Sequence, residues 1–195
     1  MPRIPPVDEA DLPASYDVIE RQRDALSDRI DSAFWNRQPT VRTFSNNPEL
    51  GELHVTANTF MWTETGLSGT ESEAVIMTVA RELDCELLWH DHVGLAVEHD
   101  RLSTDQILAI ADRETEAFDD SLGALVEYTV EYVTEQGAVG DETHEALAAH
   151  YDDDQVVGVV MLAGFYVSLS HEVRALGLTR DGFVGWHLEG HDHEG

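Results

Sequence analysis

Apolar residues recur at helical spacing along most of the chain, between residues that typically begin and end helices. One such stretch follows Asn47-Pro48, an N-cap with proline at the first helical position, and precedes Gly66, a helix-ending residue. Its residues at helical spacing are Leu50, Leu53, His54, Ala57, Phe60 and Met61. We therefore expect a helix between residues 47 and 66.

Two further helix starts carry a stronger signal. Ser68 is followed three residues later by Glu71, and Ser103 by Gln106. In this capping box, each side chain satisfies the other residue's backbone N–H. We expect one helix after each serine. The first should direct Val75, Ile76, Val79 and Ala80 inward, and the second Ile107, Leu108 and Ile110.

The remaining apolar stretches also predict helices. One runs from about Cys85 to His99, with Asp84 as its N-cap. Others are expected at 120–136, 141–149 and 154–176. The last is rich in β-branched residues, but its length, beyond about 20 residues, favours a buried helix over a strand.

These elements predict one all-α domain over residues 14–186, because no linker or low-complexity segment interrupts it. Residues 1–13 hold four of the six prolines and are expected to form an extended arm. Residues 187–195 form an acidic, histidine-containing tail, for which a solvated terminus is favoured over a metal site.

Composition narrows the class of function. The chain of 195 residues carries 39 acidic and 11 basic residues, a formal net charge of −28, and is 42% hydrophobic. It is too apolar for a disordered chain, and its charge repels nucleic-acid phosphates and anionic lipid headgroups. The sequence contains no run of about 18 apolar residues, which a membrane-spanning helix would need. Residues 1–6 lack a signal-peptide stretch, so we expect a soluble, cytoplasmic protein.

All 11 basic residues are arginine, and lysine is absent. Such an acidic surface is typical of a halophile's cytoplasmic protein, because self-repulsion is damped only when the Debye length falls to roughly 3 Å at 1 M salt. We predict that the melting temperature rises between dilute buffer and molar KCl. A melting temperature that does not rise would contradict this.

The candidate catalytic residues lie around Cys85. Because this is the single cysteine of the chain, an intramolecular disulfide is excluded. On a helix, Cys85 and His92 share one face with Leu88, Trp89, Ala96 and His99. The two reactive side chains are about 10 Å apart along the axis, so they need a bridging group. Glu73 is the candidate, since a buried glutamate suits a proton relay. Cys85 as a small buried hydrophobe and Glu73 as a solvated first-turn acid remain alternatives.

The spacing Glu73-x11-Cys85-x2-Leu88-x3-His92, followed by Leu102-Ser103, resembles the carboxymuconolactone decarboxylase family, which includes the alkylhydroperoxidase D-like proteins, and suggests a haloarchaeal-type member. The resemblance covers roughly residues 40–180 and implies a helical bundle built around a helical hairpin, assembled as trimers or hexamers. In the peroxidase branch it implies a Cys-x-x-Cys pair. Here Leu88 occupies the place of the second cysteine.

The leading hypothesis is a cysteine-dependent antioxidant enzyme with peroxiredoxin activity towards hydroperoxides. Cys85 would be its nucleophile, His92 would transfer protons and Glu73 would relay them; no metal or organic cofactor is expected. An oxidised Cys85 would need an external thiol or another subunit to resolve it.

Two alternatives stay open. One is an acid–base enzyme that processes a small lactone or carboxylate with His92 and Glu73, with Arg81 as the nearest arginine to hold the anion. The other is a non-catalytic helical oligomer that binds an apolar ligand. Tyr166 and His171 are further candidates for the pocket, while a metal site at His90 and His92 is disfavoured by poor geometry.

Overall fold

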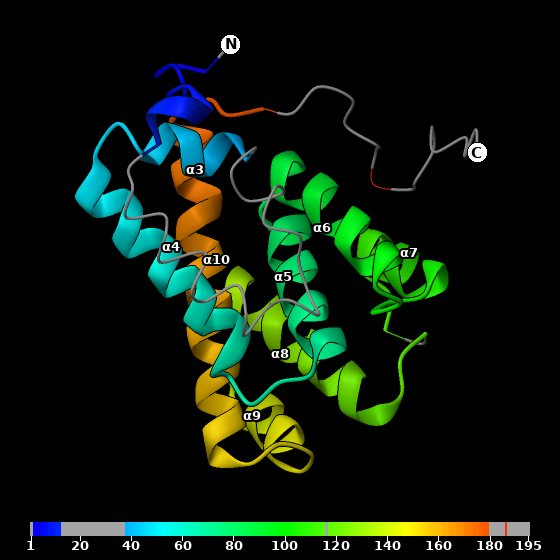
Figure 1. Ribbon diagram of the computed structural model, residues 1–195. Helices are drawn as coiled ribbons and strands as arrows, with labels where there is room; N and C mark the ends of the chain where they lie inside the picture. Colours follow the sequence, from blue (N-terminus) through cyan, green and yellow to red (C-terminus); the bar gives the residue numbers. More distant parts are fainter. Residues whose placement is uncertain (1, 13–37, 116, 180–185, 187–195) are drawn as a thin grey trace.

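A computed structural model of the chain describes residues 2–12, 38–115, 117–179 and 186. These residues form eight α-helices and one short 3-10 helix, and they contain no strand (Figure 1). The all-α prediction is confirmed. The elements are η1 (Glu9–Asp11), α3 (Pro39–Phe44), α4 (Pro48–Thr63), α5 (Gly69–Glu82), α6 (Glu86–Glu98), α7 (Thr104–Asp112), α8 (Asp120–Thr134), α9 (Asp141–Ala148) and α10 (Asp153–Ala175).

Local capping explains where these helices begin. The Asn47 side chain accepts a hydrogen bond from the backbone N–H of Leu50 at the start of α4. Both predicted capping boxes are present, at α5 and at α7. A third, Asp152 with Gln155, begins α10 slightly earlier than the sequence predicted. The expected helices are therefore confirmed in position, and α3 is an additional one.

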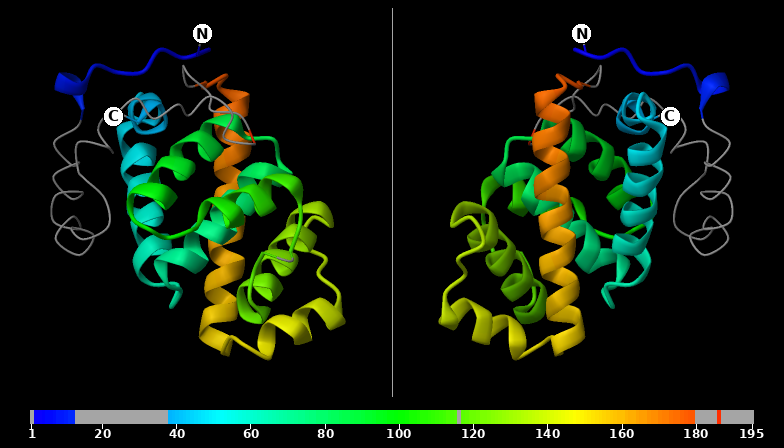
Figure 2. Two further views of the ribbon diagram at one scale, coloured as in Figure 1. Left: turned by 90° about the vertical axis from the view of Figure 1, so that its right-hand side faces the viewer. Right: turned by 90° about the vertical axis from the view of Figure 1, so that its left-hand side faces the viewer.

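Helix α5 is the centre of the bundle, and every residue from 72 to 80 on it is buried. It packs against α6, α8 and α10, and α4 lies along α10 (Figure 2). Helix α10 is long and apolar enough to cross a membrane by length and composition alone, but 44% of its most apolar window is buried inside the bundle. Its buried apolar residues, such as Val159, Leu162 and Leu169, pack in the protein core, which is compatible with a soluble protein, whereas Val157 and Met161 are exposed.

Three local predictions are corrected by the structure: the buried face of α4, the N-cap of α6 and the burial of His99. The buried face of α4 consists of Gly51, Val55, Asn58, Thr59 and Trp62. The apolar positions recognised in the sequence are largely outside it, with Leu50 61% and Leu53 63% exposed.

The N-cap of α6 is Cys85 and not Asp84. Asp84 has a positive φ of 48° and its carboxylate pairs with Arg81, so it cannot cap the helix. His99, expected on the buried face of α6, is exposed at the end of that helix.

The first residues lie against the ends of α10 and α3. The backbone N–H of Arg3 donates to the Leu176 carbonyl at 2.8 Å, and that of Val7 donates to the Arg42 carbonyl at 3.1 Å. The N-terminal residues thus cover one end of the bundle. The predicted arm is not extended throughout, because it contains the 3-10 helix η1. Residues 1 and 13 of this arm and the whole of the predicted tail, 187–195, lie outside the described residues.

Candidate functional site

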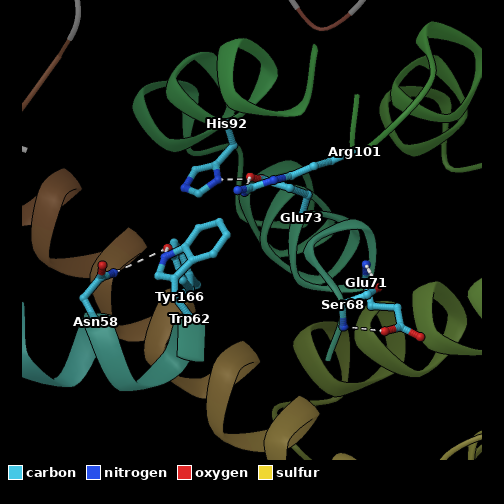
Figure 3. Close-up of polar contacts among 8 residues, drawn as sticks. All are labelled: Asn58, Trp62, Ser68, Glu71, Glu73, His92, Arg101 and Tyr166. Carbon is cyan, nitrogen blue, oxygen red and sulfur yellow. Dashed lines mark hydrogen bonds and ion pairs between the residues drawn. The ribbon is translucent and has the colours of Figure 1, made fainter. Parts of the chain in front are cut away.

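A buried carboxylate, Glu73, lies between an imidazole and a guanidinium. Its Oε2 is 2.8 Å from Nδ1 of His92, and its Oε1 accepts from Nη1 of Arg101 at 2.7 Å (Figure 3). The Glu73 side chain is fully buried, and those of His92 and Arg101 are each 7% exposed. Two of the three predicted residues, Glu73 and His92, therefore meet, and the structure adds Arg101.

Three elements bring these side chains together. Glu73 belongs to the buried run of α5, and His92 to the face of α6 that packs against it. Arg101 follows α6 after a short turn, where the positive φ of Asp100 turns the chain and the Arg101 N–H bonds to the Ala96 carbonyl. A buried charge needs a partner, and here the Arg101 guanidinium supplies the opposite charge.

Aromatic rings fix the imidazole. The Trp62 ring is parallel to that of His92 within 3°, with centroids 5.9 Å apart, and the Arg101 guanidinium lies 5.1 Å from the Trp62 centroid. The Tyr166 ring meets His92 edge-on at 5.4 Å. Its hydroxyl oxygen accepts from Trp62 Nε1 at 3.1 Å and from Asn58 Nδ2 at 3.4 Å (Figure 3). The imidazole is thus held on both sides.

His92 borders a cavity of about 40 Å³ between α3, α4, α6 and α10, which we call the inner cavity. Because the carboxylate of Glu73 can only accept, Nδ1 of His92 carries the hydrogen and Nε2 is left as a proton acceptor. Gln38 and Asn58 also line this cavity, and their side-chain oxygens are buried without a hydrogen-bond partner. Burial raises the pKa of Tyr166, so its hydroxyl stays protonated and can donate.

The third predicted residue, Cys85, borders a different cavity of about 260 Å³, together with residues such as Leu87, Arg174 and Leu178. Its side chain is buried. Burial raises the pKa of the Cys85 thiol, opposed by the backbone N–H groups of Leu88 and Leu87 and the charge of Arg174. The Ser170 hydroxyl is also near, but it makes no hydrogen bond of good geometry. Leu87 borders both cavities, and the thiol does not reach His92 directly.

We predict that Cys85 alkylates slowly at neutral pH. Because the pKa of its thiol is raised, the reactive thiolate is scarce at pH 7 and increases as pH rises above the ordinary thiol pKa. The iodoacetamide reaction rate of the folded chain should therefore still be climbing at a pH where the unfolded chain has reached its plateau. A folded-state rate that levels off at lower pH than in denaturant would contradict this.

Other sequence candidates lie elsewhere. Arg81, which was expected to hold a substrate anion, donates to the Ala111 carbonyl at 2.7 Å and pairs with Asp84. The arginine beside Glu73 is Arg101. His171 is exposed, whereas Tyr166 does line the inner cavity. Within the described ranges, no group of three or more histidine, cysteine or acidic side chains is placed to hold a metal ion.

The sequence reasoning missed Arg101, Asn58 and Trp62. One signal pointed to Arg101, which is the only arginine between Arg81 and Arg113. Asn58 and Trp62 are four residues apart and so share a face of α4. That face was obscured by the more apolar stripe beside it, which turned out to be exposed.

No protein-family model matches the sequence, and a search of curated proteins finds no match. Solved structures do match. An Agrobacterium tumefaciens protein, described as of unknown function and assigned to antioxidant defence as AhpD, aligns with a TM-score of 0.65 and 17% identity over 70% of this chain and 94% of its own.

The debrominase Bmp8 is similar over nearly the whole chain. Its apo structure gives a TM-score of 0.77 at 12% identity, covering 95% of this chain and 96% of Bmp8. A cysteine-to-alanine variant of Bmp8 in complex with 2,3,4-tribromopyrrole gives a TM-score of 0.75 at 11% identity, covering 92% of this chain and 91% of the Bmp8 chain. These likenesses define the fold as an AhpD-like helical fold, which agrees with the fold expected from the sequence.

Proposed function

We propose that this chain is an enzyme that transfers protons to and from a small molecule, with His92 as the base. The carrying observation is the 2.8 Å contact between Glu73 Oε2 and His92 Nδ1, which leaves Nε2 available at the inner cavity. A histidine whose second nitrogen is held by a buried carboxylate is the usual form of an oriented general base.

Each residue has a part in such a reaction. His92 Nε2 accepts a proton from a carbon beside a carbonyl group, and the bonding pair moves to the carbonyl oxygen as an enolate. The Tyr166 hydroxyl donates to that oxygen, as donors do at sites where negative charge develops. Glu73 stabilises the imidazolium, and Arg101 holds Glu73 in place. His92 then returns the proton to carbon or oxygen, which completes an isomerisation or a lactone rearrangement.

Hydroperoxide reduction at Cys85 is a second candidate. It is favoured by the larger cavity beside the thiol and by the backbone N–H groups at the start of α6. The thiolate would attack the outer peroxide oxygen, giving a sulfenic acid and, after protonation, an alcohol. One external thiol would then form a mixed disulfide with loss of water, and a second would regenerate Cys85.

Two variants separate these functions. We expect His92→Asn to slow proton transfer by about 10²- to 10⁴-fold, because the base is lost. Cys85→Ser should leave it unchanged. The measurement is exchange of the α-hydrogens of a panel of small lactones and ketones against D₂O, followed by NMR in molar KCl.

The same variants are assayed for cumene hydroperoxide consumption with dithiothreitol. Exchange that survives His92→Asn, or that no member of the panel shows, would contradict the proton-transfer proposal. Peroxide consumption that is abolished by Cys85→Ser and kept by His92→Asn would support the second candidate instead.

A further inference from the structure

An apolar groove lies on the surface beside the inner cavity. It has a volume of about 550 Å³ and we call it the α4 groove. Its apolar lining comes from the N-terminal residues, α3, α4 and α10, and consists of Ile4, Phe44, Leu50, Leu53, Ala57 and Phe165. The exposure of Leu50 and Leu53 is unusual for a chain that is otherwise covered with acids. Neither the fold nor the proposed reaction accounts for this groove.

One side chain, His54, borders both the α4 groove and the inner cavity. Its ring meets Phe44 edge-on at 4.7 Å and is stacked on Phe165 at 5.2 Å. It makes no hydrogen bond to any other described residue. Glu172, which also lines the groove, interacts electrostatically with the imidazole. A turn of the His54 ring would join the two spaces.

The inner end of this path needs hydrogen-bond donors. Gln38 Oε1 and Asn58 Oδ1 are acceptors without partners, and both residues are 4% exposed. Leaving such a group buried and unpaired is energetically unfavourable. His92 Nε2 is a third acceptor at the same cavity. Each O–H or N–H hydrogen that a ligand brings into the cavity can satisfy one of these acceptors.

Charge restricts the ligand further. The charged residue that lines the α4 groove is Glu172, and the chain as a whole carries −28. An anionic head would be repelled by this field and would face acceptors in the cavity. A neutral ligand is favoured.

We infer that the α4 groove and the inner cavity form one binding site for a neutral molecule with an apolar alkyl or aryl body and a hydroxyl head. The body lies along Leu50 and Leu53, and the hydroxyl passes His54 to reach Asn58 and His92. This inference rests on the proposed function, because the ligand reaches the same histidine. A substrate of this class would carry its hydroxyl beside the carbonyl group, whereas the probes below carry the hydroxyl alone and report binding only. Alcohols and phenols share the required head.

Calorimetric titration of the full chain in molar KCl tests the inference. The probes are n-octanol, para-butylphenol, octanoate and heptyl methyl ether. We expect saturable binding of the alcohol or the phenol, and the tighter of the two identifies the source of the hydroxyl. Octanoate, which is anionic, and the ether, which has no donor, should each bind at least about 10-fold more weakly.

Leu53→Asn should weaken binding of the hydroxyl probe at least about 10-fold, because Leu53 lines the groove. Val157→Asn is the matched control, since Val157 is 60% exposed on α10 and does not line the groove. Equal affinities of these two variants would overturn the inference, and so would equal affinities of octanol and octanoate. If no probe binds and Leu53→Asn lowers the particle mass in sedimentation, a second copy covers the groove and the inference is wrong.

These experiments distinguish failure of the binding-site inference from failure of the proposed proton-transfer function. His92→Asn should lose proton transfer, and its affinity for the hydroxyl probe should also fall, because His92 is one of the two residues that the hydroxyl reaches. Binding without exchange in the wild-type chain would retain the site and reject the function. Exchange that is insensitive to Leu53→Asn would retain the function and reject the site.

Discussion

Replacing Glu73 by glutamine is expected to destabilise the protein by about 3–5 kcal/mol, because it breaks the buried ion pair between Glu73 and the Arg101 guanidinium. A glutamine has nearly the same shape and can still accept one hydrogen bond, so the loss reports the charge and not the volume. Since a domain has only about 5–15 kcal/mol of stability, the effect would be large. Urea unfolding in molar KCl measures it.

The matched control is Glu71→Gln, the same chemical change on the same helix two residues earlier. Glu71 caps the backbone N–H of Ser68, and glutamine performs that role equally well (Figure 3). We expect a change within about 0.5 kcal/mol. Similar stabilities of the Glu73 and Glu71 variants would show that the buried ion pair is not formed.

A double variant tests the origin of the loss. Replacing Arg101 by methionine together with Glu73→Gln removes both partners of the ion pair, so the double variant should lose less stability than the sum of the losses in the two single variants. Additive costs would mean that Glu73 and Arg101 act independently.

Gly158→Ala is expected to be the most damaging small change on α10, with a loss of about 3 kcal/mol. An added Cβ at this position would overlap the carbonyl oxygen of Thr65 and press on its backbone carbon atoms. Backbone atoms cannot swing aside as a flexible side chain can. Thr65 precedes the cap of α5, so the shift would reach the helix that carries Glu73.

Gly94→Ala on α6 is the matched control for Gly158→Ala. Nothing lies within 4 Å of a Cβ added at Gly94. Alanine is the better helix former by about 0.8–1.0 kcal/mol, so this change should stabilise the protein or leave it unaffected. In thermal unfolding, the melting temperature of Gly158→Ala should therefore fall, whereas that of Gly94→Ala should rise or stay the same. A Gly158→Ala variant as stable as Gly94→Ala would show that α10 does not approach Thr65 so closely.

The prediction of the helices succeeded where the determining interaction lies within a few residues. The boxes at Ser68 and Ser103 join groups three positions apart, so the sequence alone specifies them. The prediction of the N-cap of α6 was wrong, although the contact that decides it is equally local. Asp84 looks like a cap, but its pairing with Arg81 and its positive φ direct it elsewhere, and a list of propensities does not contain that contact.

The buried face of α4 was also beyond local reasoning. Its most apolar stripe is exposed, while Asn58 and Trp62 turn inward to reach Tyr166 on α10. Which face of a helix is buried depends on the helices packed around it. The periodicity of α4 alone does not contain that information.

The sequence by itself determined an all-helical chain, its acidic and lysine-free composition, and the spacing of Glu73, Cys85 and His92. Only the tertiary structure decided that Glu73 and His92 meet, that Arg101 joins them, and that Cys85 borders another cavity. The reason is physical: spacing along one helix fixes the direction of a side chain, whereas contacts between α5, α6 and the Arg101 turn depend on how separate elements pack.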